Sequence, residues 1–223
     1  MPIRILVVDH YGLLRMAIGL CLAKEPDMEV VGEAEDGRVA VRLARELNPD
    51  VIIMDVAMPN LNGVEATRQI VREQSNMKII AFSAASDRRS VQEMLEAGAS
   101  GYVPKSCSFD ELHTAIRNVA SNHAYLSPQI CKVVVDGYIS RSANRNCSVA
   151  SHLTAREREV LQLLAEGRST KTMAKVLCLS TKTIEWHRSR IMKKLGIESI
   201  AGLVRYAIVE GITSIELAPV EVF

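Results

Sequence analysis

The chain contains 223 residues, of which 48% are hydrophobic and 24% charged, and its formal net charge is +1. This length suits two domains, and this composition is ordinary for a globular protein. We expect no membrane-spanning segment, because no apolar run approaches the ~20 residues that cross a bilayer. The five cysteines are scattered without metal-ligand spacing, which indicates reduced thiols in a cytoplasmic protein.

The charges are distributed unevenly along the chain. Residues 1–121 carry 13 Lys and Arg against 17 Asp and Glu, whereas residues 151–195 carry 10 against 4. An acidic front half and a basic rear segment indicate two separate functions. We therefore predict a domain over residues 1–121, a linker over 122–150, a second domain over 151–215 and a tail over 216–223.

In the first domain, short runs rich in Ile and Val alternate with amphipathic helical patterns. This alternation predicts an α/β fold in which a five-stranded parallel sheet is doubly wound, with helices on both faces. The expected strands are Ile3–Val8, Glu29–Glu33, Val51–Asp55, Lys78–Phe82 and Gly101–Val103. The expected helices are Leu13–Lys24, Gly37–Leu47, Gly63–Glu73, Arg88–Ala97 and Phe109–Ala120.

The alternation stops after residue 121. Ser127 and Pro128 can start one more short helix, Gln129–Ile139, and the stretch SRSANRNCSVAS that follows is polar and aperiodic. This composition is typical of a linker.

The second domain is predicted to be all-α, with four short helices. Thr154 and Glu157 have the spacing of a capping box ahead of an apolar run. The tight link Cys178–Ser180 between two of the helices predicts a helix-turn-helix. The expected helices run from Thr154 to Gly167, over Thr170–Leu177 behind a Ser169 cap, from Ser180 to Gly196, and over Ser199–Glu210.

Reactive side chains follow four of the predicted strands. Asp9 follows the first strand, Asp55 ends the third, Ser83 follows the fourth and Lys105 follows the fifth. The carboxyl ends of parallel strands meet at one edge of a sheet, where ligands bind. There, two carboxylates can hold a hard cation such as Mg²⁺, and a hydroxyl and an ammonium can bind phosphoryl oxygens. Asp55 can then act as a nucleophile that becomes an acyl phosphate; the alternative is that these residues only cap helices and solvate loops.

Three segments, VIIMDVAMPNLNGVEATRQI, AFSA and GYVPKS, resemble the receiver domain of bacterial two-component response regulators. The resemblance covers the whole predicted first domain and implies a flavodoxin-like fold. It also implies that Asp55 accepts a phosphoryl group from a histidine kinase and that Ser83 and Lys105 contact its oxygens. In such domains the carbonyl of Ala57 would help to bind Mg²⁺ together with Asp9 and Asp55. Tyr102 matches the aromatic residue that turns inward when the hydroxyl at the position of Ser83 moves.

His10 departs from the pattern of this family, which usually has two adjacent acids after the first strand. A neutral imidazole is a poor Mg²⁺ ligand and a protonated one repels the cation, so the ligand role of His10 is doubtful and Mg²⁺ affinity is weakened. Phosphorylation at Asp55 could then be ordinary, slow, served by another metal, or dispensable. The last case describes a phosphate-independent receiver that acts as a dimerisation or partner-binding module.

In the second domain, the helix over residues 182–195 has two different faces. Ile184, Ile191 and Leu195 form its apolar stripe. The opposite face carries Lys182, Trp186, Ser189 and Lys193, with Arg190 beside them and Glu185 at the margin. Such a face fits a helix in the DNA major groove, where cations meet phosphates and central residues reach base edges. The alternative is a solvated basic face with Trp186 packed on a neighbouring element.

The stretch LTAREREVLQLLAEGRSTKTMAKVLCLSTKTIEWHRSRIMKKLGI resembles the LuxR-type DNA-binding domain, and the whole chain resembles response regulators of the NarL/FixJ type. The resemblance implies that 182–194 is the recognition helix, with Glu185, Trp186 and Ser189 as base readers. It further implies DNA contacts from Lys182, Thr183, Arg190 and Lys193. The dimerisation residues would be Ile200, Leu203, Val204, Ala207 and Ile208.

We therefore predict a transcriptional regulator that is not an enzyme and that binds double-stranded DNA as a homodimer. Charge at Asp55 would shift the receiver toward an active conformation that frees the recognition helix or promotes dimers. Two alternatives stay open, the phosphate-independent receiver and a hydrolase that uses an aspartyl phosphate. The hydrolase would need an acid two residues after Asp55, where the sequence has Ala57.

Overall fold

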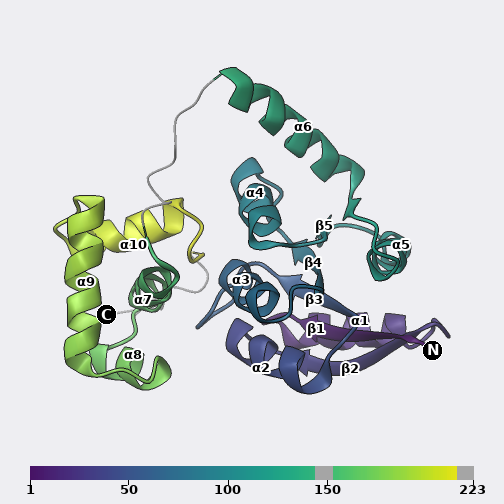
Figure 1. Ribbon diagram of the computed structural model, residues 1–223, viewed down its shortest axis with the longest axis horizontal. Coiled ribbons are helices and arrows are strands. Elements are labelled where there is room, and N and C mark those ends of the chain that lie inside the picture. Colours follow the sequence, from purple (N-terminus) through teal and green to yellow (C-terminus); the bar gives the residue numbers. More distant parts are fainter. Residues whose placement is uncertain (144–152, 215–223) are drawn as a thin grey trace. The chain divides into compact units, whose positions relative to one another are not determined.

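The computed structural model describes residues 1–143 and 153–214, and the side chains of 137–143 are outside the description. The chain divides into two compact units near residue 145. Figure 1 shows an α/β unit built around one sheet and a smaller unit built only of helices. No helix of the described residues is long and apolar enough to cross a membrane. Cys21, Cys107, Cys131 and Cys178 are free thiols, and Cys147 lies outside the described residues.

The first unit contains a parallel sheet in the order β2-β1-β3-β4-β5-β6. This order places β1 and β3 in the interior, where β3 is buried at every position. The apolar runs that the sequence shows here are what a sheet covered on both faces requires. The strands are β1 (Ile3–Val8), β2 (Met28–Ala34), β3 (Val51–Asp55), β4 (Lys78–Ser83), β5 (Gly101–Pro104) and β6 (Tyr125–Leu126).

Two hydrophobic cores lie on the two faces of this sheet. Leu6 and Val8 face one core, which helices α2, α3 and α4 cover. Ile5 and Val7 face the other core, which α1 and α5 cover. The alternation along β1 follows from the two-residue period of a strand. The helices are α1 (Gly12–Leu22), α2 (Gly37–Leu47), α3 (Gly63–Glu73), α4 (Arg88–Ala97) and α5 (Phe109–Ala120).

Side-chain caps fix the starts of four of these helices, whereas α1 begins after Tyr11 without one. Asp36 accepts hydrogen bonds from two backbone N–H groups of α2, and Asn62 accepts one from α3. Asp87 and Ser108 cap α4 and α5 in the same way. Each cap satisfies donors that a helix leaves open at its first turn, so the helices begin where short polar residues follow the strands.

The first part of the predicted linker over 122–150, with its short helix, differs from the prediction because it packs onto the sheet. Tyr125–Leu126 forms the short parallel strand β6, which extends the sheet beyond the five predicted strands. Helix α6 spans Pro128–Ala143, longer than the predicted Gln129–Ile139, and Ile130 is fully buried in the core beside α4. The rest of the predicted linker, and the tail over 216–223, lie outside the described residues.

The second unit packs its helices around a core that includes Val160, Leu164, Ile184 and Ile191. Thr154 and Glu157 form a complete capping box, and Ser169 and Ser180 cap the next two helices, as the sequence predicts. Ser199, predicted as the first residue of the last helix, is its cap. The turn between α8 and α9 contains Cys178 in a left-handed conformation with φ of 53°. The helices are α7 (Ala155–Ala165), α8 (Thr170–Val176), α9 (Thr181–Leu195) and α10 (Ile200–Val209).

Candidate functional site

Four side chains from three separate parts of the sequence converge at the carboxyl edge of the sheet. The Nζ atom of Lys105 lies 2.7 Å from Oδ2 of Asp9 and 3.1 Å from Oδ2 of Asp55. The Nδ1 atom of His10 lies 3.0 Å from that same Asp55 oxygen. Asp9 and Asp55 are each 1% exposed. We call these four residues the acid pocket.

The loops after β1 and β5 hold the acid pocket in place. Oδ1 of Asp9 accepts a 2.8 Å hydrogen bond from the backbone N–H of Tyr11. Arg15, on α1, donates a 2.6 Å hydrogen bond to the Asp9 carbonyl. On the other side, the backbone N–H of Lys105 donates to the carbonyl of Ser83 at 2.8 Å. The positions of both Asp9 and Lys105 are thus set by backbone bonds as well as by their ion pair.

The side chains of Ser83 and Tyr102 lie next to this edge on β4 and β5. Ser83 is buried, and its Oγ accepts a 3.1 Å hydrogen bond from the backbone N–H of Ala85. Tyr102 is fully buried, with its hydroxyl donating to the carbonyl of Ala85 at 2.6 Å. The Tyr102 side chain therefore lies inside the first unit in this structure. The backbone N–H of Ala57 lies 3.4 Å from Oδ1 of Asp55.

Burial and charge act in opposite directions on Asp55. Burial raises the pKa of this carboxyl above its usual value, the Lys105 ammonium opposes the rise, and the Asp9 carboxylate adds to it. Burial likewise raises the pKa of Tyr102 to about 12, so its hydroxyl remains a donor at neutral pH. Two carboxylates and one ammonium, counted without the imidazole, sum to one net negative charge, which favours a cation.

In the second unit, the face of α9 that the sequence assigns to DNA is the outward one. Ile184 and Ile191 are buried in the core, whereas Trp186 is 52% exposed. The Arg190 guanidinium lies 4.7 Å from the centre of the Trp186 ring, within cation–π distance. The other proposed contacts, Lys182, Glu185, Ser189 and Lys193, are exposed, and Thr183 is half-buried.

A buried carboxylate on α7 anchors the basic side of α9. Glu157 is 2% exposed, and its Oε2 accepts hydrogen bonds from Lys194 at 2.6 Å and from the Thr154 backbone at 2.8 Å. Its Oε1 lies 3.5 Å from Nε of Arg190. Glu157 therefore joins the capping box of α7 to two cations of α9.

The predicted dimerisation surface on α10 needs a correction. Leu203 and Ala207 are fully buried in the core of the second unit, so neither can contact a partner while the unit is folded as described. Ile200 is 52% exposed, and Val204 and Ile208 are partly exposed. The apolar positions of α10 form one helical stripe in the sequence, but only tertiary packing shows which of them are covered.

Residues outside the predicted set also shape the acid pocket. A Cβ atom at Gly63, the first residue of α3, would lie 2.0 Å from the carbonyl oxygen of Asp55. The Asn62–Gly63 pair before a helical pattern is the signal that could have indicated this close approach. Arg15 and Tyr11 gave no such signal, because their roles depend on where α1 packs.

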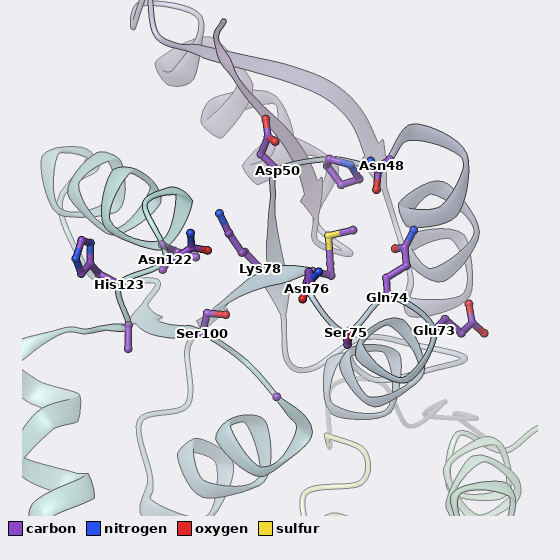
Figure 2. A pocket seen from close by; sticks show the side chains of 15 residues that line it. Asn48, Asp50, Glu73, Gln74, Ser75, Asn76, Lys78, Ser100, Asn122 and His123 are labelled. Atoms are coloured by element: carbon purple, nitrogen blue, oxygen red, sulfur yellow. The ribbon is translucent and has the colours of Figure 1, made fainter.

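A hollow of about 980 Å³ lies at the opposite edge of the sheet (Figure 2). Asp50 and Lys78, at the amino ends of β3 and β4, line it together with Asn76 and His123. Lys78 donates to the carbonyl of Ala120 at 2.6 Å, and Asp50 accepts from the backbone of Arg4 at 2.8 Å. Asp50 and Lys78 thus bond to the backbone of other segments, whereas the charged side chains of the acid pocket contact one another.

Both units match known families. Residues 5–117 match the response regulator receiver domain, and residues 151–207 match bacterial regulatory proteins of the luxR family. Transcriptional regulatory protein LiaR of Bacillus subtilis is 38% identical over 205 residues, which cover 92% of this chain and 96% of that protein. Response regulator GacA of Pseudomonas aeruginosa is 35% identical over 209 residues, which cover 94% and 97%.

This chain is also similar to solved structures of response regulators. A two-component response regulator of the LuxR family from Aurantimonas superposes with a TM-score of 0.60 at 33% identity, covering 62% of this chain and 99% of that one. RcsB of Salmonella typhimurium is similar in fold, with a TM-score of 0.57 at 24% identity over 93% of this chain and 99% of that one. The chain therefore belongs to the response regulators, with a receiver domain followed by a regulatory domain of the luxR family.

Proposed function

We propose that this protein is a cytoplasmic DNA-binding transcription regulator that accepts a phosphoryl group on Asp55 from a histidine kinase. The observation that carries the proposal is a buried carboxylate at the end of β3, paired with Lys105 at 3.1 Å, in a chain of this family. An oxygen of Asp55 would attack the phosphorus of a phosphohistidine, forming a P–O bond as the P–N bond breaks. Lys105 would balance charge on the phosphoryl oxygens, and Ser83 would turn its hydroxyl to them.

Magnesium, the usual metal of receiver domains, fits the acid pocket poorly. Asp9, Asp55 and the carbonyl of Ala57 offer oxygen atoms, which Mg²⁺ prefers. His10 presents a nitrogen 3.0 Å from Asp55, where the family usually has an acid. We therefore expect Mg²⁺ to bind more weakly than it does with two adjacent acids.

The exposed face of α9 supports DNA binding by the second unit. Lys182, Arg190 and Lys193 would meet phosphates, while Glu185, Trp186 and Ser189 would reach base edges, with Thr183 at the helix start. Because Arg190 is held between Trp186 and Glu157, its guanidinium is already placed on this face.

Dimerisation through α10 would bring two such helices onto paired half-sites. Ile200, Val204 and Ile208 are the exposed or partly exposed apolar residues that remain for this contact. An Ile200→Asp variant should therefore sediment as a monomer and bind a two-half-site duplex more weakly, without loss of helix content.

A phosphorylation assay tests the receiver part of the proposal. The full chain is incubated with acetyl phosphate, with and without a divalent cation, and the acyl phosphate is detected by phosphate-affinity electrophoresis. We expect a shifted band for the wild type and none for Asp55→Asn. No acyl phosphate under either condition would contradict phosphorylation at Asp55.

The contact between His10 and Asp55 favours a second candidate, the phosphate-independent receiver. The Asp55 oxygen that faces the acid pocket already has both His10 and Lys105 as partners. In that case the wild type and Asp55→Asn would bind DNA with equal affinity.

Trp186 provides the DNA assay, because it is the single tryptophan of the chain. Duplex DNA is titrated at two salt concentrations while Trp186 fluorescence is recorded. We expect quenching that weakens with salt, and Lys182→Ala should reduce the salt slope by about one phosphate contact. An unchanged signal would contradict the proposed orientation of α9 on DNA.

A further inference from the structure

The acid pocket contains a nitrogen donor among its carboxylates. One ligand atom from each of Asp9, His10 and Asp55 can be chosen so that all three atoms lie within 4.8 Å of one another. Ligands of one transition metal ion lie about 3 Å apart, since each bond is about 2.0–2.2 Å long. The 3.0 Å between His10 Nδ1 and Asp55 Oδ2 already has this value, and the 4.0 Å to Asp9 Oδ1 needs a small side-chain movement.

The imidazole of His10 is oriented by its neighbour in the chain. The Tyr11 ring lies 3.8 Å from the His10 ring, centre to centre. The Tyr11 backbone also binds Asp9 Oδ1, at 2.8 Å. Residues 9–11 therefore hold the nitrogen and one carboxylate on the same side of the acid pocket, and such contacts support metal ligands in other proteins.

Lys105 and His10 share one oxygen of the acid pocket but contact different oxygens of Asp9. The Lys105 ammonium lies 3.1 Å from Oδ2 of Asp55, which His10 also contacts, and a metal ion bound to that oxygen would take the place of this contact. At Asp9 the ammonium contacts Oδ2, whereas Oδ1 is the oxygen closer to His10. A metal ion on the His10 side can therefore bind Asp9 without displacing Lys105 from Oδ2. The side chain of His10 is 17% exposed and both acids are buried, so an ion would enter past the imidazole.

One imidazole nitrogen and two carboxylates favour some divalent ions over others. Mg²⁺ prefers oxygen ligands only, whereas Mn²⁺, Co²⁺, Ni²⁺ and Zn²⁺ accept imidazole nitrogen together with carboxylates. We propose that the acid pocket binds a transition metal ion of this group in preference to Mg²⁺, with His10 Nδ1, Asp9 and Asp55 as side-chain ligands. When Nδ1 binds the metal, the single proton of the neutral imidazole resides on Nε2.

This proposal deepens the proposed function, because the receiver would use the metal at Asp55. Its test measures binding and needs no phosphoryl transfer, so the two can fail separately. Metal-free full-length protein is titrated with Co²⁺ and, separately, with Mg²⁺ by calorimetry. The proton NMR spectrum of the Co²⁺ form is then searched for a strongly shifted, exchangeable imidazole N–H signal.

We expect one Co²⁺ per chain, at least about tenfold tighter than Mg²⁺, and one shifted N–H signal. His10→Asp should lose that signal and bring the two affinities together or reverse their order, because it restores an all-oxygen set. His10→Ala should lose the signal without adding charge, so it keeps the test valid if the aspartate variant folds poorly. His123→Gln removes an exposed histidine from the opposite edge of the sheet and should change nothing.

Several results would overturn the proposal. The wild type would bind Mg²⁺ as tightly as Co²⁺ or more tightly, or would not bind Co²⁺ at all. Alternatively, His10→Asp would leave the ratio of the Co²⁺ and Mg²⁺ affinities unchanged, or His123→Gln would lose the shifted N–H signal. If acetyl phosphate still modifies Asp55 when Co²⁺ does not bind, the metal assignment is lost and phosphorylation stands. If Co²⁺ binds through His10 and Asp55 accepts no phosphoryl group, the opposite holds.

Discussion

Replacing Glu157 by glutamine should destabilise the second unit by a calculable amount. The variant keeps an oxygen for the Thr154 backbone but loses the charge that pairs with Lys194 at 2.6 Å. A hydrogen bond to a charged group contributes about 1.5–3 kcal/mol and a neutral one about 0.5–1.5 kcal/mol. Arg190, half exposed and 3.5 Å away, adds little because solvent screens it. We therefore expect a loss of about 1–2 kcal/mol.

The assay uses Trp186 on α9, so fluorescence reports unfolding of this unit alone. The expected loss corresponds to a decrease in Tm of about 5–15 °C for a unit of this size. Glu185→Gln is the matched control, because it makes the same substitution at an exposed position of α9. It should leave Tm unchanged.

Acid should remove the difference between the wild type and Glu157→Gln. Burial by itself would raise the pKa of Glu157, but hydrogen bonds from Lys194 and Thr154 outweigh burial and hold this pKa below its ordinary value of 4.5. The stabilisation is therefore fully present above that ordinary value and is lost as pH falls through the lower pKa of the folded state. An equal Tm of variant and wild type at neutral pH, or a difference that persists in strong acid, would refute this reasoning.

Three further changes test the receiver unit by urea unfolding followed with circular dichroism. Gly63→Ala should lower the free energy of unfolding by about 2 kcal/mol or more, because the added Cβ would lie 2.0 Å from the Asp55 carbonyl oxygen. Gly19→Ala is the control and should not destabilise the unit, because no atom lies within 4 Å of its added Cβ. Equal losses of stability in the two variants would contradict the steric reason. Tyr102→Phe should cost about 1 kcal/mol by removing the hydrogen bond to Ala85. An alkaline absorbance titration of that variant should lack a phenol with a pKa of about 12, and an unchanged curve would contradict the burial of this hydroxyl. Lys105→Met should lower the free energy of unfolding by about 3 kcal/mol, because it leaves two buried carboxylates without the ammonium. Adding Asp55→Asn to this variant should recover part of the lost stability. If the effects of the two substitutions on stability simply add, the two side chains are not coupled.

The sequence by itself determined most of the secondary structure and the edge of the sheet where the reactive residues lie. Apolar runs set the strands, and short polar caps such as Thr154, Ser169 and Ser180 set the helix starts. These signals act within a few residues, so they can be read along the chain. Parallel topology then places Asp9, Asp55 and Lys105 at one edge, whatever the details of packing.

Only the tertiary structure decided which atoms meet. It showed that His10 contacts Asp55, that Gly63 must lack a side chain beside the Asp55 carbonyl, and that Leu203 is buried. It also placed β6 within the sheet, where the sequence predicted a linker. The sequence shows whether a residue is apolar or polar, and therefore whether it favours burial or water. Which residue it contacts is decided only when distant segments of the chain pack together.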